Sequence, residues 1–280
     1  MSMRGICVAW MIVLFVSCGI AMGEERASTA QPNVHVLSPL HMPGLDRERT
    51  LRIYLPPGYE TSTRRYPVLY MHDGQNLFDA ATAPFGEWRV DETLNELART
   101  NKLELIVVGI DHGDAKRMQE LNPWENDKYG KGEGREYLRF LVEVVKPYID
   151  ARYRTKPDRA HTAIMGSSLG GLVSHFAIYE YSSVFGKAGI FSPSYWFAPA
   201  VVDFTRTHRL APDLRIVFYA GGKESDEMLP DMQAIVAILK QQGVAASNLR
   251  VDVEPQAKHN EKAWSADFPR AVEWLFDGAH

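Results

Sequence analysis

The sequence predicts an α/β protein built on a mostly parallel, twisted sheet, with helices on both faces and an antiparallel edge at its N-terminal side. Short apolar runs alternate with longer segments of helical periodicity, as expected for parallel strands joined by crossover helices. The first two strands have no helix between them, so they are expected to pair antiparallel. Near the middle of the chain, a G-x-S-x-G string joins a strand to a helix.

Each predicted element follows from its local pattern. The first two strands, over 34–40 and 50–55, are separated by the turn signal Pro43-Gly44-Leu45-Asp46. Continuous apolar runs are expected for strands covered on both faces, and they predict strands over 67–71, 105–110, the run from 163 into Ser168, 187–191, 214–219 and 249–253. Apolar residues at helical spacing predict helices over 88–99, 135–153, 172–179, 229–242 and 261–276.

The composition indicates an ordinary globular protein. Of 280 residues, 45% are hydrophobic and 24% are charged, which is enough apolar material for a sizeable core. With 31 basic and 35 acidic residues the formal net charge is -4, so the chain lacks the basic footprint of a nucleic-acid-binding protein. No repeat or linker-like shift divides the chain, and residues 34–280 are expected to form one domain.

The N-terminus has the pattern of an export signal over residues 1–23. Arg4 provides a short positive region, an apolar stretch follows over 6–16, and Ala21-Met22-Gly23 is a small-x-small cleavage site. The apolar stretch is too short for a comfortable membrane span, although an uncleaved anchor is the alternative. Residues 24–33 are expected to be a mobile leader. The mature chain is then periplasmic or extracellular, with no membrane span.

The two cysteines, Cys7 and Cys18, both lie in this signal segment. After cleavage the mature chain has no disulfide, no cysteine nucleophile and no thiolate metal site. The run Phe15-Val16-Ser17-Cys18 has some features of a lipoprotein processing box, in which case Cys18 would be the lipidated N-terminus. No metal site and no cofactor is implied by the sequence.

The string Gly166-Ser167-Ser168-Leu169-Gly170 positions Ser168 at the centre of a sharp turn between a strand and a helix, the context of a nucleophile elbow. The flanking glycines are needed because a Cβ there would clash with the adjoining strand or helix. Such a turn holds the hydroxyl clear of the sheet and directs the first helical amides toward a developing oxyanion. A simple glycine-rich turn gives the same string, so the interpretation depends on partners elsewhere.

A catalytic serine needs a base within hydrogen-bond reach and a carboxylate that orients this base. In this context the chain order is serine, acid, histidine. His259 follows the last predicted strand and is the candidate base. Glu224 and Asp226 both follow the strand ending at Gly221; position favours Glu224 and leaves Asp226 as the alternative acid. These groups lie just beyond strand ends, where ligands bind in such sheets, and they predict an acyl-transfer serine enzyme.

Loops beyond the strand ends supply the remaining candidates. The oxyanion is expected to contact the amide of Leu169 and an amide near Gln75. Arg117, in the long polar loop 111–133, is a candidate for binding an anionic or catecholate group. The candidates for stacking on an aromatic acyl group or a sugar are Trp124, Tyr195 and Trp196. The alternative for all of these side chains is packing or solvation within the loops.

Three stretches together resemble the putative esterase family of the α/β-hydrolases: residues 70–78 (Tyr-Met-His-Asp-Gly-Gln-Asn-Leu-Phe), residues 166–171, and His259-Asn260-Glu261 with Trp264. The similarity spans residues 34–277. The family includes enterochelin (siderophore) esterases, feruloyl and acetyl-xylan esterases, S-formylglutathione hydrolases and mycolyltransferases. The resemblance implies an α/β-hydrolase fold.

For this sequence the resemblance implies Ser168 as nucleophile, His259 as base and the carboxylate of the G-x-x-E/D loop, here Glu224, as acid. The family more often has Asp in this loop, which keeps Asp226 open. The residue after Gly74, namely Gln75, is implied as the second oxyanion donor.

The implied activity is that of an exported serine carboxylic-ester hydrolase working through an acyl-enzyme on a small-molecule or carbohydrate ester. Siderophore, feruloyl and acetyl-sugar esters are candidate substrates, and export disfavours the formylglutathione role. The alternatives are an acyltransferase of the same fold and a non-catalytic binding protein that retains it. The natural substrate and the oligomeric state stay open.

Overall fold

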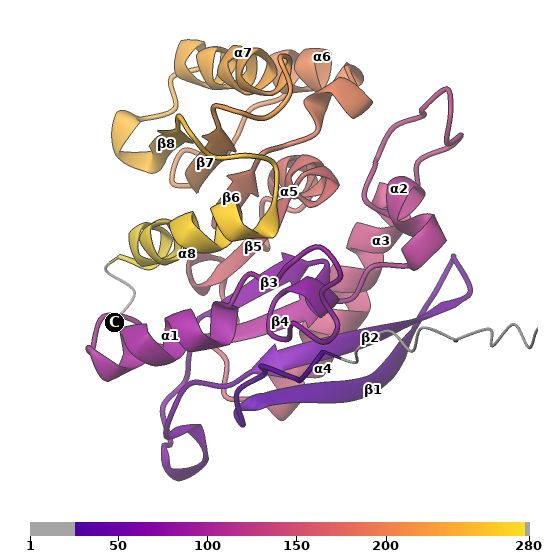
Figure 1. The fold of residues 1–280 in the computed structure, drawn as a ribbon. Helices are drawn as coiled ribbons and strands as arrows, with labels where there is room; N and C mark the ends of the chain where they lie inside the picture. The colour runs from indigo at the N-terminus through magenta and orange to yellow at the C-terminus, as the bar shows by residue number, and fades with distance from the viewer. Residues whose placement is uncertain (1–25, 278–280) are drawn as a thin grey trace, which may run out of the picture.

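The computed structural model describes residues 26–277, in which eight strands form one sheet in the order β1-β2-β4-β3-β5-β6-β7-β8 (Figure 1). The first three strands in this order pair antiparallel: β1 (Val34–Met42), β2 (Arg47–Tyr54) and β4 (Ile106–Ile110). All later pairings are parallel, through β3 (Val68–His72), β5 (Thr162–Ser167), β6 (Lys187–Phe191), β7 (Arg215–Gly221) and β8 (Leu249–Glu254). The predicted sheet, including its antiparallel edge, is confirmed.

Helices cover both faces of this sheet, as predicted (Figure 1). On one face α1 (Val90–Arg99) and α8 (Glu261–Phe276) pack side by side. The opposite face is covered by α3 (Gly134–Phe140), α4 (Lys146–Arg152), α5 (Leu169–Glu180), α6 (Ala200–Thr207) and α7 (Met228–Gln241). A short helix, α2 (Arg117–Glu120), lies in the long loop after β4.

The alternation of side chains along the strands produces two separate cores. In β3, Val68 and Tyr70 belong to the core beneath α5, whereas Leu69 and Met71 belong to the core beneath α1 and α8. All five residues of this strand are buried, because helices cover both of its faces. The carboxyl ends of the parallel strands therefore form one accessible edge with well-packed walls beneath it.

Two helical segments differ from their prediction. The helix predicted over 135–153 contains a π-helical turn at Leu141–Val145, between α3 and α4. Pro147 follows at the start of α4, and because proline lacks an N–H the regular hydrogen-bond ladder is broken at this point. Helix α6 was not predicted; its eight residues are too few for the apolar period to stand out from a loop.

The described part of the predicted leader is anchored by polar contacts. Arg26 donates a hydrogen bond to the carbonyl of Ala83, and both Ser28 and Thr29 donate to the carboxylate of Asp79. The backbone amide of Gln31 donates to Asp91 at 2.8 Å. Residues 26–31 therefore contact the loop before α1 and the first turn of this helix.

The predicted signal peptide over residues 1–23, with Cys7 and Cys18, lies outside the described residues. Between residues 26 and 277 no helix combines the length and apolar character that a membrane span requires.

Candidate active site

Ser168 lies at a strained turn between β5 and α5, as the glycine pattern predicted. Its backbone has φ 59° and ψ -121°, a conformation that a non-glycine residue rarely adopts and that is found where the surrounding structure enforces it. A Cβ on Gly166 would lie 2.8 Å from both the Gly170 carbonyl carbon and His72 Cδ2, and one on Gly170 would lie 3.3 Å from His72 Cβ. The small neighbours let strand and helix meet closely enough to form the turn.

His259 and Glu224 are joined by a hydrogen bond of 2.7 Å between Nδ1 and Oε2. The Glu224 side chain is fully buried, while His259 is 37% exposed and remains accessible from the cavity. The second oxygen of Glu224 accepts hydrogen bonds from Ser192 Oγ and from the Gly221 amide, each at 2.6 Å. Asp226, the alternative acid, is exposed to solvent. The structure therefore brings Glu224, not Asp226, to the histidine.

The loop that carries His259 is held from two sides. Trp264 packs edge-on against the imidazole, with ring centroids 5.0 Å apart, and its Nε1 donates a hydrogen bond to Ser192 Oγ at 2.9 Å. The side chain of Asn260 caps α8 by accepting from the Ala263 amide at 3.0 Å. Ser192 also donates to Glu224. Its hydroxyl therefore links the Glu224 carboxylate to the Trp264 indole, which packs against His259.

Ser168 and His259 line the same cavity, which has a volume of about 420 Å³. A second hollow of about 440 Å³, which Trp196 also lines, opens on the other side of the same two residues. In this conformation the Ser168 hydroxyl is hydrogen-bonded to Ser194 Oγ at 3.0 Å. Among the described residues no hydrogen bond joins the Ser168 hydroxyl to His259, so the two groups must come into contact for proton transfer. Loose geometry of this kind is common before substrate binds.

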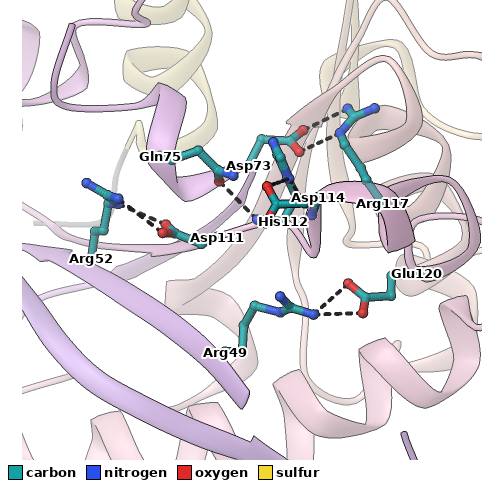
Figure 2. A network of polar contacts seen from close by, with 9 residues as sticks. All are labelled: Arg49, Arg52, Asp73, Gln75, Asp111, His112, Asp114, Arg117 and Glu120. Atoms are coloured by element: carbon teal, nitrogen blue, oxygen red, sulfur yellow. Dashed lines mark hydrogen bonds and ion pairs between the residues drawn. The ribbon is translucent and has the colours of Figure 1, made fainter. Parts of the chain in front are cut away.

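The two expected oxyanion donors lie at the start of helical turns. Leu169 is the first residue of α5, so its amide has no earlier carbonyl of the helix to pair with. Gln75 lies in the single 3₁₀ turn Gly74–Asn76 after β3. Its side-chain oxygen is engaged elsewhere, because Gln75 Oε1 accepts a hydrogen bond from the His112 amide at 2.9 Å (Figure 2). The backbone amide of Gln75 is the candidate donor.

The turn at Gly74 lies against the end of β4. A Cβ on Gly74 would lie 2.6 Å from Asp111 Oδ1 and 2.8 Å from the carbonyl carbon of Gly109. Asp111 in turn is held by Arg52 through hydrogen bonds of 2.9 and 3.1 Å (Figure 2). This packing fixes the loop that borders the cavity on the side of β3.

Arg117 lines the cavity, as a binding residue should, but its charge is already matched. Its Nε and Nη2 donate to the two carboxylate oxygens of Asp73 at 2.7 and 2.9 Å (Figure 2). Burial opposes ionisation of Asp73, yet the Arg117 charge and hydrogen bonds outweigh it and lower the pKa of this carboxyl. Arg117 is thus one half of a buried ion pair rather than a free cation awaiting an anionic substrate.

Glu261 is a cavity residue that sequence reasoning gave no role. It is the first residue of α8, follows His259-Asn260 directly, and is only 7% exposed. Burial raises the pKa of its carboxyl, and the nearby Asp73 carboxylate acts in the same direction. Apart from its own backbone amide, no described residue donates a hydrogen bond to this carboxylate. The sequence feature that could have indicated this role is the position of Glu261 two residues after the candidate base. Only the fold shows that α8 begins at the cavity wall.

The aromatic candidates divide between the cavity and the core. Trp196 lines the second hollow and is largely exposed, so it is available to a ligand. Tyr195 is buried and its hydroxyl pairs with His175 Nδ1 at 2.8 Å, which corrects its assignment as a stacking surface. The Trp124 ring packs edge-on against Phe176 and Phe204, so the structure uses it in packing and does not bring it to either hollow around Ser168.

Two buried histidines are held neutral and are unsuited to act as the base. His72 bonds Tyr137 Oη at 2.7 Å and Ser174 Oγ at 3.1 Å, and burial lowers its pKa to about 4. Burial likewise lowers the pKa of His175 to about 3. The His72 ring lies against the elbow glycines and the His175 ring bonds Tyr195 and Thr205, whereas His259 alone of the three is partly exposed at the cavity.

Comparison with known proteins identifies the family of this chain. The family model described as "Putative esterase" matches residues 43–275, so the chain belongs to the putative esterase family. The chain is 30% identical over 243 residues to the uncharacterized protein YbbA of Bacillus subtilis, covering 81% of this chain and 92% of that protein. It is 24% identical over 233 residues to an endo-1,4-beta-xylanase/feruloyl esterase of Xylanibacter ruminicola, covering 81% of this chain but 29% of that protein.

Solved structures share the fold. A ferulic acid esterase superposes with a TM-score of 0.67 at 19% identity, covering 87% of this chain and 98% of the other. The enterobactin esterase FES from Shigella flexneri superposes with a TM-score of 0.73 at 19% identity, covering 90% of this chain and 61% of the other. The family and these neighbours support a carboxylic-ester hydrolase with an α/β-hydrolase fold.

Proposed function

We propose that the protein is a serine carboxylic-ester hydrolase in which Ser168 is the nucleophile, His259 the general base and Glu224 the orienting acid. The observation that carries this proposal is the buried Glu224 carboxylate bonded to His259 on the cavity that Ser168 lines from its strained turn. A carboxylate at Nδ1 fixes the tautomer that leaves Nε2 free to accept a proton, and it stabilises the imidazolium that then forms.

The reaction proceeds in two steps. Ser168 Oγ attacks the ester carbonyl carbon while His259 takes the hydroxyl proton, and the tetrahedral oxyanion accepts hydrogen bonds from the amides of Leu169 and Gln75. Collapse breaks the bond to the alcohol oxygen, which takes the proton from His259, and an acyl-enzyme remains. Water, deprotonated by His259, then attacks the acyl carbonyl and releases the acid and the free Ser168 hydroxyl.

The charges around the cavity favour a neutral substrate. Arg117 is neutralised by Asp73, and Glu261 adds a further carboxylate to the wall. Phe85, Trp88 and Trp264 provide apolar surface beside these groups. Neutral aromatic or sugar esters, of the kind named for the feruloyl esterase relative, therefore fit better than the anionic esters expected of an iron-loaded siderophore. Export of the mature chain, inferred from residues 1–23, is part of the proposal.

The proposal is tested with purified protein on a panel of methyl ferulate, an acetylated sugar, a short-chain aryl ester and a catecholate siderophore ester. We expect hydrolysis of at least one neutral ester, abolished in Ser168→Ala. Ser194→Ala is the matched control: Ser194 contacts Ser168 and shares the second hollow, but is expected to retain most activity. Equal loss in both variants, or activity unchanged in Ser168→Ala, would contradict the assignment.

The two alternatives predict different behaviour in the same assay. An acyltransferase would transfer the acyl group to an added sugar or alcohol faster than to water. A binding protein would show no turnover of any ester while still folding normally.

A further inference from the structure

Three carboxylates converge where the chain enters α1, outside the proposed catalytic groups. Glu87, Asp91 and Glu92 each bring one oxygen to within 4.8 Å of the other two. Glu87 belongs to the loop before the helix, while Asp91 and Glu92 are in its first turn. No sequence motif indicated this cluster, because its geometry depends on how that loop folds onto the helix.

Each of the three carboxylates is held by one oxygen and leaves the other without a donor. The pairings of the first oxygens are Thr29 Oγ1 with Glu87 at 2.8 Å, the Gln31 amide with Asp91 at 2.8 Å, and Arg89 Nε with Glu92 at 3.4 Å. The second oxygens, Glu87 Oε1, Asp91 Oδ1 and Glu92 Oε2, are buried and accept no hydrogen bond from any residue between 26 and 277. The Asp91 side chain is completely buried.

Buried carboxylate oxygens without a donor are costly, and each of the three clustered residues carries one. Among the ion pairs of the described residues, the cation that contacts the cluster is Arg89, which is 63% exposed and pairs with Glu92. Three carboxylates with one arginine leave about two negative charges uncompensated, a balance that one divalent cation restores. Because every available ligand atom is a carboxylate oxygen, the cluster suits a hard cation such as Ca²⁺ rather than a metal that prefers nitrogen or sulfur.

We propose that Glu87, Asp91 and Glu92 form a binding site for a divalent cation, with Ca²⁺ as the favoured ion and water completing its coordination. The same carboxylates hold Thr29 and Gln31 through their first oxygens. The cation therefore fastens residues 26–31 to the start of α1 and also braces the loop 85–88.

That loop connects the cation site to the wall of the catalytic cavity. Phe85 and Trp88 line the cavity, and a Cβ on Gly86 would lie 3.4 Å from Glu261 Cβ. The site is structural: it stabilises the cavity wall and takes no part in bond making or breaking.

The experiment measures Ca²⁺ binding to the full-length mature protein after removal of metals with EDTA. The measurement is made at pH 8, so that carboxyl groups are available to the cation. We expect saturable binding of one Ca²⁺ per chain by calorimetry. We also expect the unfolding temperature to rise by about 5 °C at a Ca²⁺ concentration 100-fold above its Kd.

Two substitutions keep the test interpretable. Asp91→Asn retains an acceptor for the Gln31 amide but removes a ligand charge, so it is expected to fold and to lose the Ca²⁺ response. Glu96→Gln, on the exposed side of the same helix, is expected to keep it. No binding of Ca²⁺ or Mg²⁺ by the wild-type chain would overturn the proposal, as would a Ca²⁺ response that survives in Asp91→Asn. A stability that rises on acidification and ignores Ca²⁺ at pH 8 would also overturn it, since Asp91 and Glu92 would then share a proton instead.

Discussion

Two buried carboxylates lie near His259, and their hydrogen bonding differs. Glu224 has both oxygens occupied, by the imidazole, a serine hydroxyl and a backbone amide. Glu261, on the cavity wall, has only its own backbone amide as a hydrogen-bond donor among the described residues, and burial raises the pKa of its carboxyl. A carboxylate whose acceptors are filled has a fixed direction and can orient a histidine. A carboxylate that still has free acceptor positions can interact with a substrate bound in the cavity.

The largest effect is expected from removing the base that Glu224 orients. His259→Ala should lower kcat/KM by about 10⁴-fold or more, because triad groups act as a unit. His208→Ala, which changes an exposed histidine at the end of α6, is the matched control and should retain full activity. Activity of His259→Ala within tenfold of the wild type would show that another group is the base.

A smaller but still large effect should separate the two candidate acids. Glu224→Gln keeps the shape of the side chain but favours the wrong imidazole tautomer, so kcat should fall by about 10³- to 10⁴-fold. Asp226→Asn changes an exposed carboxylate two residues away and should have little effect. A larger loss of kcat in Asp226→Asn than in Glu224→Gln in steady-state assays would make Asp226 the acid.

The ion pair between Asp73 and Arg117 should matter mainly for stability. Arg117→Met leaves the Asp73 carboxylate buried without its partner and should lower the free energy of unfolding by about 3 kcal/mol in urea titrations. The control, Arg99→Met, breaks an exposed pair with Glu96 and should change stability little. Equal stabilities of the two variants would mean that Arg117 is solvated.

This ion pair also predicts a pH dependence with a definite sign. Because Arg117 lowers the pKa of Asp73 below its ordinary value of 3.8, the stabilisation is present above the unfolded pKa and is lost as the pH falls through the folded pKa. The difference in stability between wild type and Arg117→Met should therefore shrink on acidification below about pH 4.

The smallest effect concerns substrate charge. Glu261→Gln should raise kcat/KM for an aryl ester carrying a carboxylate on its acyl chain by about tenfold, while the neutral analogue changes little. Since the pKa of Glu261 is raised, the wild-type enzyme should also discriminate less against the anionic ester at mildly acidic pH. Glu60→Gln, a remote exposed substitution, controls for net charge. A Glu261→Gln enzyme with unchanged discrimination would show that this carboxylate does not face the substrate.

Much of the fold was predictable because strands buried on both faces read as continuous apolar runs. No local sequence pattern predicts the order of the strands in the sheet. The alternation of strands and helices does predict that most strands are parallel, because strands joined by crossover helices run in the same direction. The Ser168 turn was predictable because its glycines are needed for close approach, a local requirement visible in the sequence.

The rest of the site depends on long-range packing. Glu224 and Asp226 are two residues apart on the same loop, so the sequence leaves both open as candidate acids. The three hydrogen bonds to Glu224 in the folded chain distinguish them. Arg117 looked like a free cation because its partner, Asp73, is 44 residues away in the chain. Trp124 looked like a ligand surface because nothing in its own loop reveals the Phe176 and Phe204 rings that cover it.

The most direct test of the central claim is to treat the purified mature protein with a fluorophosphonate and to map the adduct by mass spectrometry, since this needs no choice of substrate. We expect one adduct, on Ser168. It should form far more slowly in His259→Ala and Glu224→Gln and not at all in Ser168→Ala. A well-folded protein that gives no adduct, or an adduct on Ser194 instead, would contradict the assignment of Ser168, His259 and Glu224.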